Sequence, residues 1–311
     1  MRKVLDVVAR WGGAVLWATL PFTAGPTLAA ALDPAGAGFR TFTSVAAWTV
    51  WVLTLVATLV PRTTTLTAVR IVVPTAPLAI GWAVVTLPTP GWQEALALTV
   101  TTLAAVVVLA PQTGDVFIDG SSYGHERRMA LRAPGVLLLG PIEAVWVAVV
   151  AGAAAGPLLV ASGTVPGGLA LTAIGWAIAV AGVRALHTLA RRWLVFTQAG
   201  VVIVDPLALA DTLLVRRSTL AWLGPAPAGT GAHDLTVGAL GLAVELRFAE
   251  PVTITPLPPR RSGRSRPAPA AIDVDAVLVA PSLPGRMLEE ARRRRLPVQA
   301  AMPPPTTSSP S

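Results

Sequence analysis

The side chains most capable of chemistry lie in one polar stretch, residues 111–134, within an otherwise apolar first two thirds of the chain. Candidate site residues here are Asp115, Asp119, Tyr123, His125, Glu126, Arg127 and Arg128. A carboxylate and an imidazole act as general base and acid when the fold brings them together. The same groups bind metal ions, phosphate or lipid head groups. The simpler interpretation, which we favour, is a solvated connection whose arginines fix the membrane topology.

Known site motifs do not occur in this stretch. Its spacing lacks the alternating ligands and closing Glu of an EF-hand loop, and its glycines are not placed as in a phosphate-binding loop. No cysteine occurs, which excludes disulfides, zinc–thiolate sites and cysteine nucleophiles. Because the three histidines are far apart and no catalytic triad or dinucleotide fingerprint occurs, we assign no catalytic residue, no metal and no cofactor.

The composition is that of a membrane protein. Hydrophobic residues make up 53% and charged residues 13% of the chain, whereas soluble domains carry about 25% charged residues. Charged residues are sparse up to residue 190 and dense after it. The net charge of +8 suits an anionic membrane surface. It would also suit nucleic acid, but no DNA- or RNA-binding motif supports that partner, and we expect none. The expected partners are the lipid bilayer and a cytoplasmic or membrane protein.

Six apolar stretches are long enough to cross a bilayer as helices, which takes about 20 residues. They span residues 11–32, 42–60, 71–87, 92–110, 135–161 and 168–186. Pro21, Gly25 and Pro26 predict a kink in the first stretch. This stretch also resembles a secretory signal peptide, with basic residues before it and small residues at its end. Cleavage would leave five spans in the same orientation.

The distribution of basic residues predicts the orientation. On one side of six spans lie Arg2, Lys3, Arg10, Arg62, Arg70, Arg127, Arg128, Arg132, Arg184, Arg191 and Arg192. Only Arg40 lies on the other side. Basic residues accumulate on the cytoplasmic side, so we expect a multi-pass protein of the cell membrane with both termini in the cytoplasm.

Glu143 lies within the fifth apolar stretch. A carboxylate at the centre of a bilayer costs about 2.5–3.5 kcal/mol and often marks a functional site. The alternative, which we favour, is that the helix begins at Pro141, because proline is tolerated in a first turn. Glu143 would then lie at the membrane interface.

Residues 191–296 predict a small β-rich domain with seven strands. The strands are expected at Trp193–Thr197, Val201–Val204, Asp211–Val215, Ser218–Leu223, Asp234–Val237, Leu242–Phe248 and Ala271–Val279. A helix is expected at Pro284–Arg295. The Pro- and Arg-rich insert 256–271 and the tail 297–311 are predicted to be disordered. Arg292, Arg293, Arg294 and Arg295 either lie on anionic lipid or complement the helix dipole as a solvated last turn.

Seven strands closed by one helix resemble a bacterial pleckstrin-homology-like (PH-like) domain. The segments that carry the resemblance are RWLVFT at 192–197, VDP at 204–206 and VLVAPSLPG at 277–285. The whole layout also resembles an uncharacterised family of actinobacterial multi-pass membrane proteins. The matching stretches are GDVFIDGSSYGHERR at 114–128, GPIEAVW at 140–146, RRWLVFTQAG at 191–200 and LTVGALGLAVELR at 235–247. This resemblance implies no activity.

The expected fold is therefore a six-span helical bundle at 1–190, containing a cytoplasmic loop at 111–134, followed by a cytoplasmic PH-like domain. The leading functional hypothesis is a non-catalytic scaffold whose PH-like domain binds a protein partner or the anionic membrane surface. The alternatives are a membrane enzyme or lipid-binding protein that uses residues 114–128, and a transporter.

Overall fold

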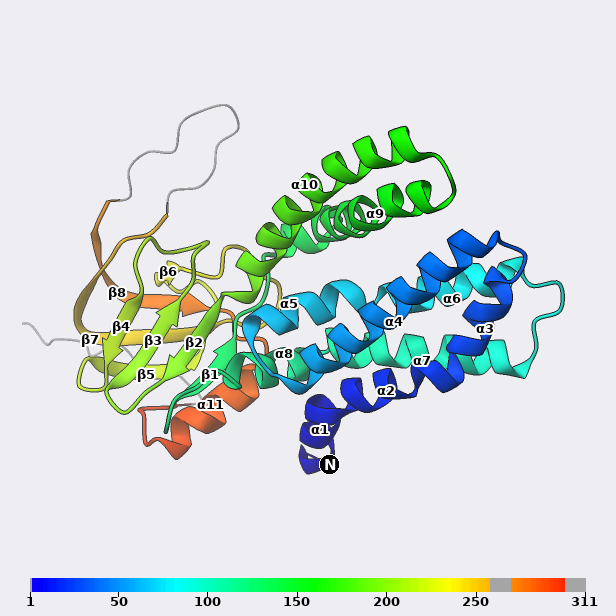
Figure 1. Ribbon diagram of the computed structural model, residues 1–311. Coiled ribbons are helices and arrows are strands. Elements are labelled where there is room, and N and C mark those ends of the chain that lie inside the picture. The colour runs from blue at the N-terminus through cyan, green and yellow to red at the C-terminus, as the bar shows by residue number, and fades with distance from the viewer. Residues whose placement is uncertain (1, 258–269, 300–311) are drawn as a thin grey trace, which may run out of the picture. The chain divides into compact units, whose positions relative to one another are not determined.

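A computed structural model describes residues 2–257 and 270–299 of the chain (Figure 1). The chain divides into two compact units. We call the first the helical unit; it contains residues up to 121 and residues 138–190. We call the second the β unit; it contains residues 122–137 and the chain from residue 191 onward. The chain therefore passes between the two units three times.

The helical unit contains helices of very different lengths. They are α1 (Arg2–Val7), the π-helical turn η1 (Val8–Gly12), α2 (Gly13–Thr23), α3 (Gly25–Leu32), α4 (Ala37–Leu59), α5 (Thr63–Val72), α6 (Thr75–Thr86), α7 (Trp92–Leu109), α8 (Pro111–Asp119), α9 (Pro141–Ala161) and α10 (Val165–Ala190). In the described part of the chain, five helices are long and apolar enough to cross a membrane. A sixth span results if the pair Val4–Thr23 and Gly25–Leu32, bent by 42°, is counted as one.

The outer faces of these helices support the membrane assignment. Only 11% of the most apolar window is buried in each of α4, α9 and α10. Exposed side chains on them include Trp48, Val147 and Trp176. Apolar surface on this scale needs an apolar solvent, because soluble proteins rarely expose large contiguous apolar patches.

Several expected span boundaries need correction. The predicted kink is present, because the first apolar stretch breaks at Ala24, directly before Gly25 and Pro26. The third span begins at Thr63, not at residue 71. The fifth begins at Pro141, not at residue 135. Residues 135–138 form a 3₁₀ turn, η2 (Gly135–Leu138), in which Gly135 N–H donates to Gly238 O at 3.0 Å.

Glycines allow α9 and α10 to pack at backbone contact. A Cβ atom added to Gly152 would lie 2.5 Å from Gly175 O, and one added to Gly168 would lie 2.7 Å from Val160 N. A Cβ atom at Gly156 would collide with the backbone of Thr172. Small residues at such spacing are a common basis of helix association in membranes, where apolar side chains gain little by leaving lipid. The sequence Gly152–Gly156, a pattern that arises easily by chance, is used here as a helix contact.

Polar side chains also join helices to one another. Trp17 Nε1–H donates to Trp51 O at 3.0 Å, and Trp51 Nε1–H donates to Trp17 O at 2.9 Å, which links α2 to α4. Trp146 Nε1–H donates to Ile71 O at 2.9 Å. Each bond places an indole donor on a backbone carbonyl, so these bulky side chains are satisfied without water.

The described residues of the β unit form two four-stranded sheets. The first has the order β1 (Arg127–Ala130), β2 (Trp193–Phe196), β3 (Gly200–Val204), β4 (Leu213–Arg216), and all its neighbours are antiparallel. The second has the order β5 (Leu220–Pro225), β7 (Val244–Ile254), β8 (Ile272–Val279), β6 (His233–Asp234). In the second sheet only the short β6–β8 pair is parallel. Seven of these strands match the predicted positions.

Strand β1 corrects the predicted division of the chain. Residues 127–130 were expected in a loop of the transmembrane domain, but they pair with β2, from Arg127 opposite Phe196 to Ala130 opposite Trp193. The hairpin of α9 and α10 is therefore inserted between two neighbouring strands of one sheet. The physical reason for the error is that a four-residue strand beginning with two arginines has no hydrophobic periodicity of its own. Only its partner strand makes it recognisable.

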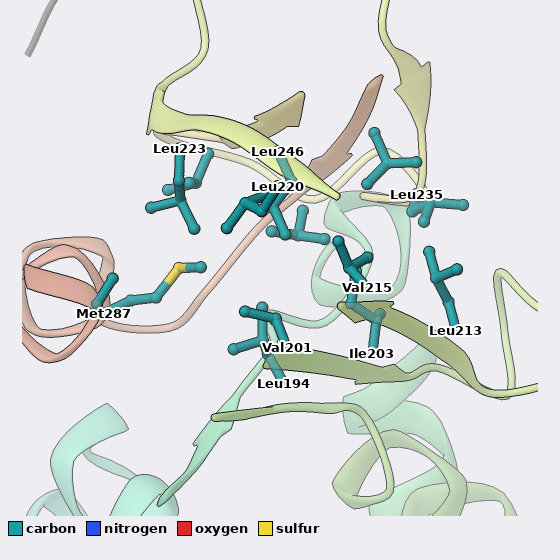
Figure 2. Close-up of a cluster of buried hydrophobic side chains, with 14 of the residues drawn as sticks. Leu194, Val201, Ile203, Leu213, Val215, Leu220, Leu223, Leu235, Leu246 and Met287 are labelled. Atoms are coloured by element: carbon teal, nitrogen blue, oxygen red, sulfur yellow. The ribbon is translucent and has the colours of Figure 1, made fainter. Parts of the chain in front are cut away.

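The core of the β unit lies between the two sheets and helix α11 (Pro284–Arg293). Figure 2 shows Met287 of α11 pointing into a cluster with Leu194 and Val201 of the first sheet and Leu223 and Leu246 of the second. The side chains of Leu194, Leu223, Leu246 and Met287 are fully buried. The predicted apolar stripe of the last helix thus closes the core.

Order continues beyond the predicted start of the C-terminal tail. Leu296 is buried, and Val298 forms a parallel bridge with Leu223. Pro256 and Leu257 also pair, with Leu209 and Ala208. The disorder predicted from residues 256 and 297 is therefore wrong at those edges, because backbone pairing and burial outweigh the Pro-rich composition. Residues 270 and 271 are described and have no regular structure, whereas residues 258–269 and 300–311 of those two predictions lie outside the described chain.

Candidate functional site

The predicted site at 114–128 is not one loop. Asp115 and Asp119 belong to α8 of the helical unit, whereas Tyr123, His125 and the residues up to Arg128 belong to the β unit. The polar stretch ends one compact unit and begins the other. This corrects the expectation of a continuous loop, and the reason is that residues 111–119 form a helix with one buried face.

Asp115 lies buried in the helical unit, with 2% of its surface exposed. Its electrostatic partner is Arg70 of α5. Gly114 makes the approach possible, because a Cβ atom there would lie only 2.7 Å from Arg70 Nη2. The guanidinium group therefore lies directly against the backbone of α8. Electrostatic attraction between the two side chains therefore links α8 to α5, so the carboxylate already has a structural use.

Asp115→Ala is expected to destabilise the helical unit strongly. Removing one member of a buried ion pair leaves the other charge uncompensated, which costs about 3–5 kcal/mol. Because Arg70 is only partly buried, we expect the free energy of unfolding to fall by about 3 kcal/mol, which is near the lower end of that range. The measurement is the midpoint of SDS-induced unfolding of the purified chain in mixed micelles. Asp33→Ala is the matched control, since Asp33 pairs with Arg40 at 3.0 Å but is 80% exposed. Equal shifts in both variants would contradict the assignment.

The β-unit part of the predicted site has different surroundings. Tyr123 is 86% exposed. At His125 the backbone carbonyl is engaged, since it accepts a hydrogen bond from Arg294 Nη2 at 2.7 Å. Glu126 Oε2 accepts from Arg128 Nη2 at 3.5 Å, next to β1. Among the described residues, no group of three or more His, Asp or Glu side chains is placed to hold a metal ion.

Glu143 occupies the first turn of α9 and is exposed. The helix begins at Pro141, as in the interfacial alternative. A carboxylate in a first turn also complements the positive end of the helix dipole. Its depth in a bilayer stays a prediction.

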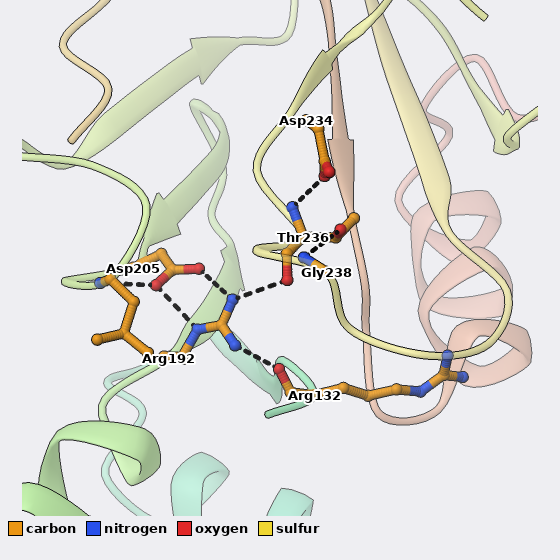
Figure 3. Close-up of polar contacts among 7 residues, drawn as sticks. Arg132, Arg192, Asp205, Asp234, Thr236 and Gly238 are labelled. Atoms are coloured by element: carbon orange, nitrogen blue, oxygen red, sulfur yellow. Dashed lines mark hydrogen bonds and ion pairs between the residues drawn. The ribbon is translucent and has the colours of Figure 1, made fainter. Parts of the chain in front are cut away.

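The most buried polar cluster of the β unit centres on Arg192 (Figure 3). Arg192 Nε and Nη2 donate to the two carboxylate oxygens of Asp205 at 2.9 and 2.7 Å. The two side chains are 1% and 0% exposed. Arg192 Nη1 also donates to Arg132 O, and Nη2 donates to Thr236 O at 3.4 Å. All three nitrogens of the guanidinium group therefore donate hydrogen bonds, as a buried charge requires.

This cluster holds together the places where the chain leaves and re-enters the β unit. Arg132 follows β1, Arg192 precedes β2, and Asp205 follows β3. The Arg132 side chain donates in turn to Leu240 O at 2.9 Å and Leu242 O at 3.3 Å. In the sequence, Arg132 and Arg192 stand out only as topology signals, and nothing singles out Asp205. The Val-Asp-Pro segment after β3 was noticed only as part of the family resemblance.

One pocket of the β unit has a basic lining. It encloses about 210 Å³ between the β2–β3 turn, the residue after β4 and the segment after α11. Its lining residues are Thr197, Gln198, Gly200, Arg217, Arg294 and Leu296. Two of the six carry a positive charge and none carries a negative charge. The pocket can therefore attract an anion.

The four C-terminal arginines do not form one uniform patch. Arg294 points into the β unit, where it donates to Glu290 Oε1 at 2.7 Å, to Phe196 O at 3.3 Å and to His125 O. Arg293 pairs with Glu289 at 3.2 Å. Arg292 and Arg295 are exposed. Of the four predicted lipid contacts, Arg294 is thus largely engaged within the protein, and its position in the pocket distinguishes it from the other three.

Comparison with models of protein families, with curated proteins and with solved structures finds no match for this chain. The resemblances to PH-like domains and to actinobacterial membrane proteins therefore stay predictions. Function is inferred below from the residues and their geometry.

Proposed function

We propose that this chain is a non-catalytic membrane scaffold whose β unit is a binding module held at the cytoplasmic face of the cell membrane. The module binds a protein partner or the anionic membrane surface. The observation that carries the proposal is the insertion of the α9–α10 hairpin between β1 and β2, two directly paired strands. Three covalent crossings tether the module to the helices, which limits its distance from the bilayer.

The former candidate site offers support for a role without catalysis. The Asp115 carboxylate interacts electrostatically with Arg70, and the backbone carbonyl of His125 accepts a hydrogen bond from Arg294. These two residues belong to different compact units, and each has a structural use in its own unit.

We further propose that the β unit is PH-like. Seven strands occur at the expected positions, and α11 follows them and closes the core with Met287, Leu288 and Ala291. The added strand β1 and the inserted hairpin would be elaborations of that domain. The proposed cytoplasmic location rests on the excess of basic residues on one side of the spans. A reporter fused after Ser311 should be active only in the cytoplasm.

The scaffold proposal is tested by unfolding the β unit without touching the helices. Leu194 lies fully buried in β2, so Leu194→Asp places a charge in the core and should unfold the module. We expect proteins or lipids that crosslink to the β unit of the full chain in native membranes to be lost from this variant. The variant itself should stay in the membrane fraction, because its spans are unchanged.

Leu214→Asp is the matched control, since Leu214 lies on β4 of the same sheet but is 48% exposed. It should retain the crosslinked partners. Retention of the same partners by Leu194→Asp, in a variant shown by proteolysis to have an unfolded β unit, would overturn the proposal.

A further inference from the structure

We propose that the basic pocket of the β unit binds a phosphoryl group, with Arg217 and Arg294 as its two cationic contacts. The pocket lies where three segments meet that are distant in the sequence: the β2–β3 turn, the end of β4 and the end of α11. Its lining residues include two arginines and the polar residues Thr197 and Gln198. Arginine is the side chain best suited to phosphate, because its planar fork presents several donors in fixed directions.

Arg294 is held in place before any ligand arrives. Three of its donors are used, by Glu290, by Phe196 O and by His125 O, and its guanidinium carbon lies 5.9 Å from the centre of the Phe196 ring. A guanidinium group has five donors. Two N–H groups of Arg294 are therefore left for a ligand, and they carry little entropic cost because the side chain is already ordered.

Arg217 contributes the second charge without an internal partner. Its backbone N–H donates to Ala199 O at 2.9 Å, which fixes the residue beside the β2–β3 turn. Its guanidinium group forms no hydrogen bond or ion pair with any described residue, and the residue is exposed. An arginine that lines a pocket and has no counter-ion among the described residues is what an anion site requires.

The turn that carries Gln198 is held by hydrogen bonds. Gly200 has φ of +153°, and a Cβ atom there would collide with Val215 O. The Thr197 hydroxyl donates to Gly200 O and accepts from Gly200 N–H, both at 3.2 Å. The mouth of the pocket is thus shaped by backbone that cannot shift easily, so an anion would meet a preorganised site.

The charge balance favours a phosphoryl group over a single carboxylate. Glu290 offsets part of the Arg294 charge, whereas no acidic side chain in the described part of the chain pairs with Arg217 or with the neighbouring Arg216. A phosphate group carries up to two negative charges and three acceptor oxygens, and therefore uses more of these donors than a carboxylate does. The phosphoryl group could be free or part of a lipid head group; the lipid source alone rests on the proposed position at the bilayer.

The test uses the full chain in nanodiscs, with an environment-sensitive fluorophore on Ser218→Cys. This cysteine would be unique, because the chain has none, and Ser218 is exposed beside Arg217. In the first arm, inorganic phosphate is titrated into phosphatidylcholine nanodiscs against chloride at equal ionic strength. In the second arm, the nanodiscs contain phosphatidic acid and no free phosphate.

We expect saturable binding in at least one arm, and the arm that responds identifies the source. Arg217→Gln should weaken binding by roughly tenfold or more, since it removes a charge-assisted contact. Arg216→Gln is the matched control: it removes the same charge from the adjacent exposed position, which does not line the pocket, and should bind as the parent does.

Two results would overturn the site. One is a response no larger than that to chloride in both arms. The other is equal weakening by the two Arg→Gln variants, which would indicate diffuse attraction to a basic surface. Hydrogen exchange of β2 and β3 would show that both variants are folded. Because the titration needs no partner protein, its failure is distinguishable from failure of the scaffold proposal, which is read from crosslinked partners.

Discussion

Asp205→Ala is expected to lower the free energy of unfolding of the β unit by about 3–5 kcal/mol, the usual cost of leaving a buried charge without its partner. Arg192 would remain 1% exposed with no counter-ion. Leu207 N–H would also lose its acceptor, Asp205 Oδ1 at 3.0 Å. The loss of stability should also affect β1, because the same guanidinium group donates to Arg132 O, two residues after that strand.

The measurement is hydrogen exchange by mass spectrometry on the full chain in detergent, read separately for β1, β2 and β3. Local readout is needed because a chain with two compact units has no single unfolding transition. Asp273→Ala is the control: Asp273 Oδ1 accepts from Thr253 Oγ1 at 2.6 Å, but the residue is exposed on β8. Its effect should stay within about 0.5 kcal/mol, as is usual for surface positions.

A second variant separates an unpaired charge from a lost contact. Arg192→Met combined with Asp205→Leu removes both charges, and exchanging a buried ion pair for apolar residues is often close to neutral. The double variant should therefore recover much of the stability lost in Asp205→Ala. If the double variant were less stable than the single one, the hydrogen bonds of Arg192 to Arg132 O and Thr236 O would be the dominant contribution.

Gly175→Val is expected to separate α9 from α10. The added Cβ atom would collide with the backbone of Gly152, which cannot move without moving the whole helix. Overpacking a close contact typically costs about 1–3 kcal/mol of stability. We expect the cost here to lie at or above the upper end of that range, because the contact is between two backbones. The SDS concentration at half-unfolding of the purified chain in mixed micelles should fall accordingly.

Gly81→Val provides the comparison. Gly81 also lies inside an apolar helix, α6, but a Cβ atom there would meet nothing within 4 Å. Both variants therefore introduce the same β-branched residue into an apolar helix, and only one of them meets a neighbouring backbone. A similar shift in the two would mean that helix propensity, not packing of the hairpin, accounts for the effect.

The sequence alone determined the elements that depend on local pattern. Long apolar runs predict the membrane-spanning helices, because lipid leaves a backbone no other partner than itself. Alternation in 193–248 and 271–279 predicts seven strands, and proline, acidic and basic residues mark the final helix. Even the bend near Gly25 follows from Pro21, Gly25 and Pro26.

Which distant residues share one unit depends on long-range contacts that become visible in the folded chain. Arg127–Ala130 becomes a strand because Trp193–Phe196 lies beside it, across an inserted hairpin. Arg192 and Asp205 become a buried pair, and Asp115 an ion-pair partner of Arg70, for the same reason. The pocket with Arg217 and Arg294 exists only where three segments meet. Charge, burial and pairing of this kind depend on neighbours that the chain supplies from far away, so no local pattern encodes them.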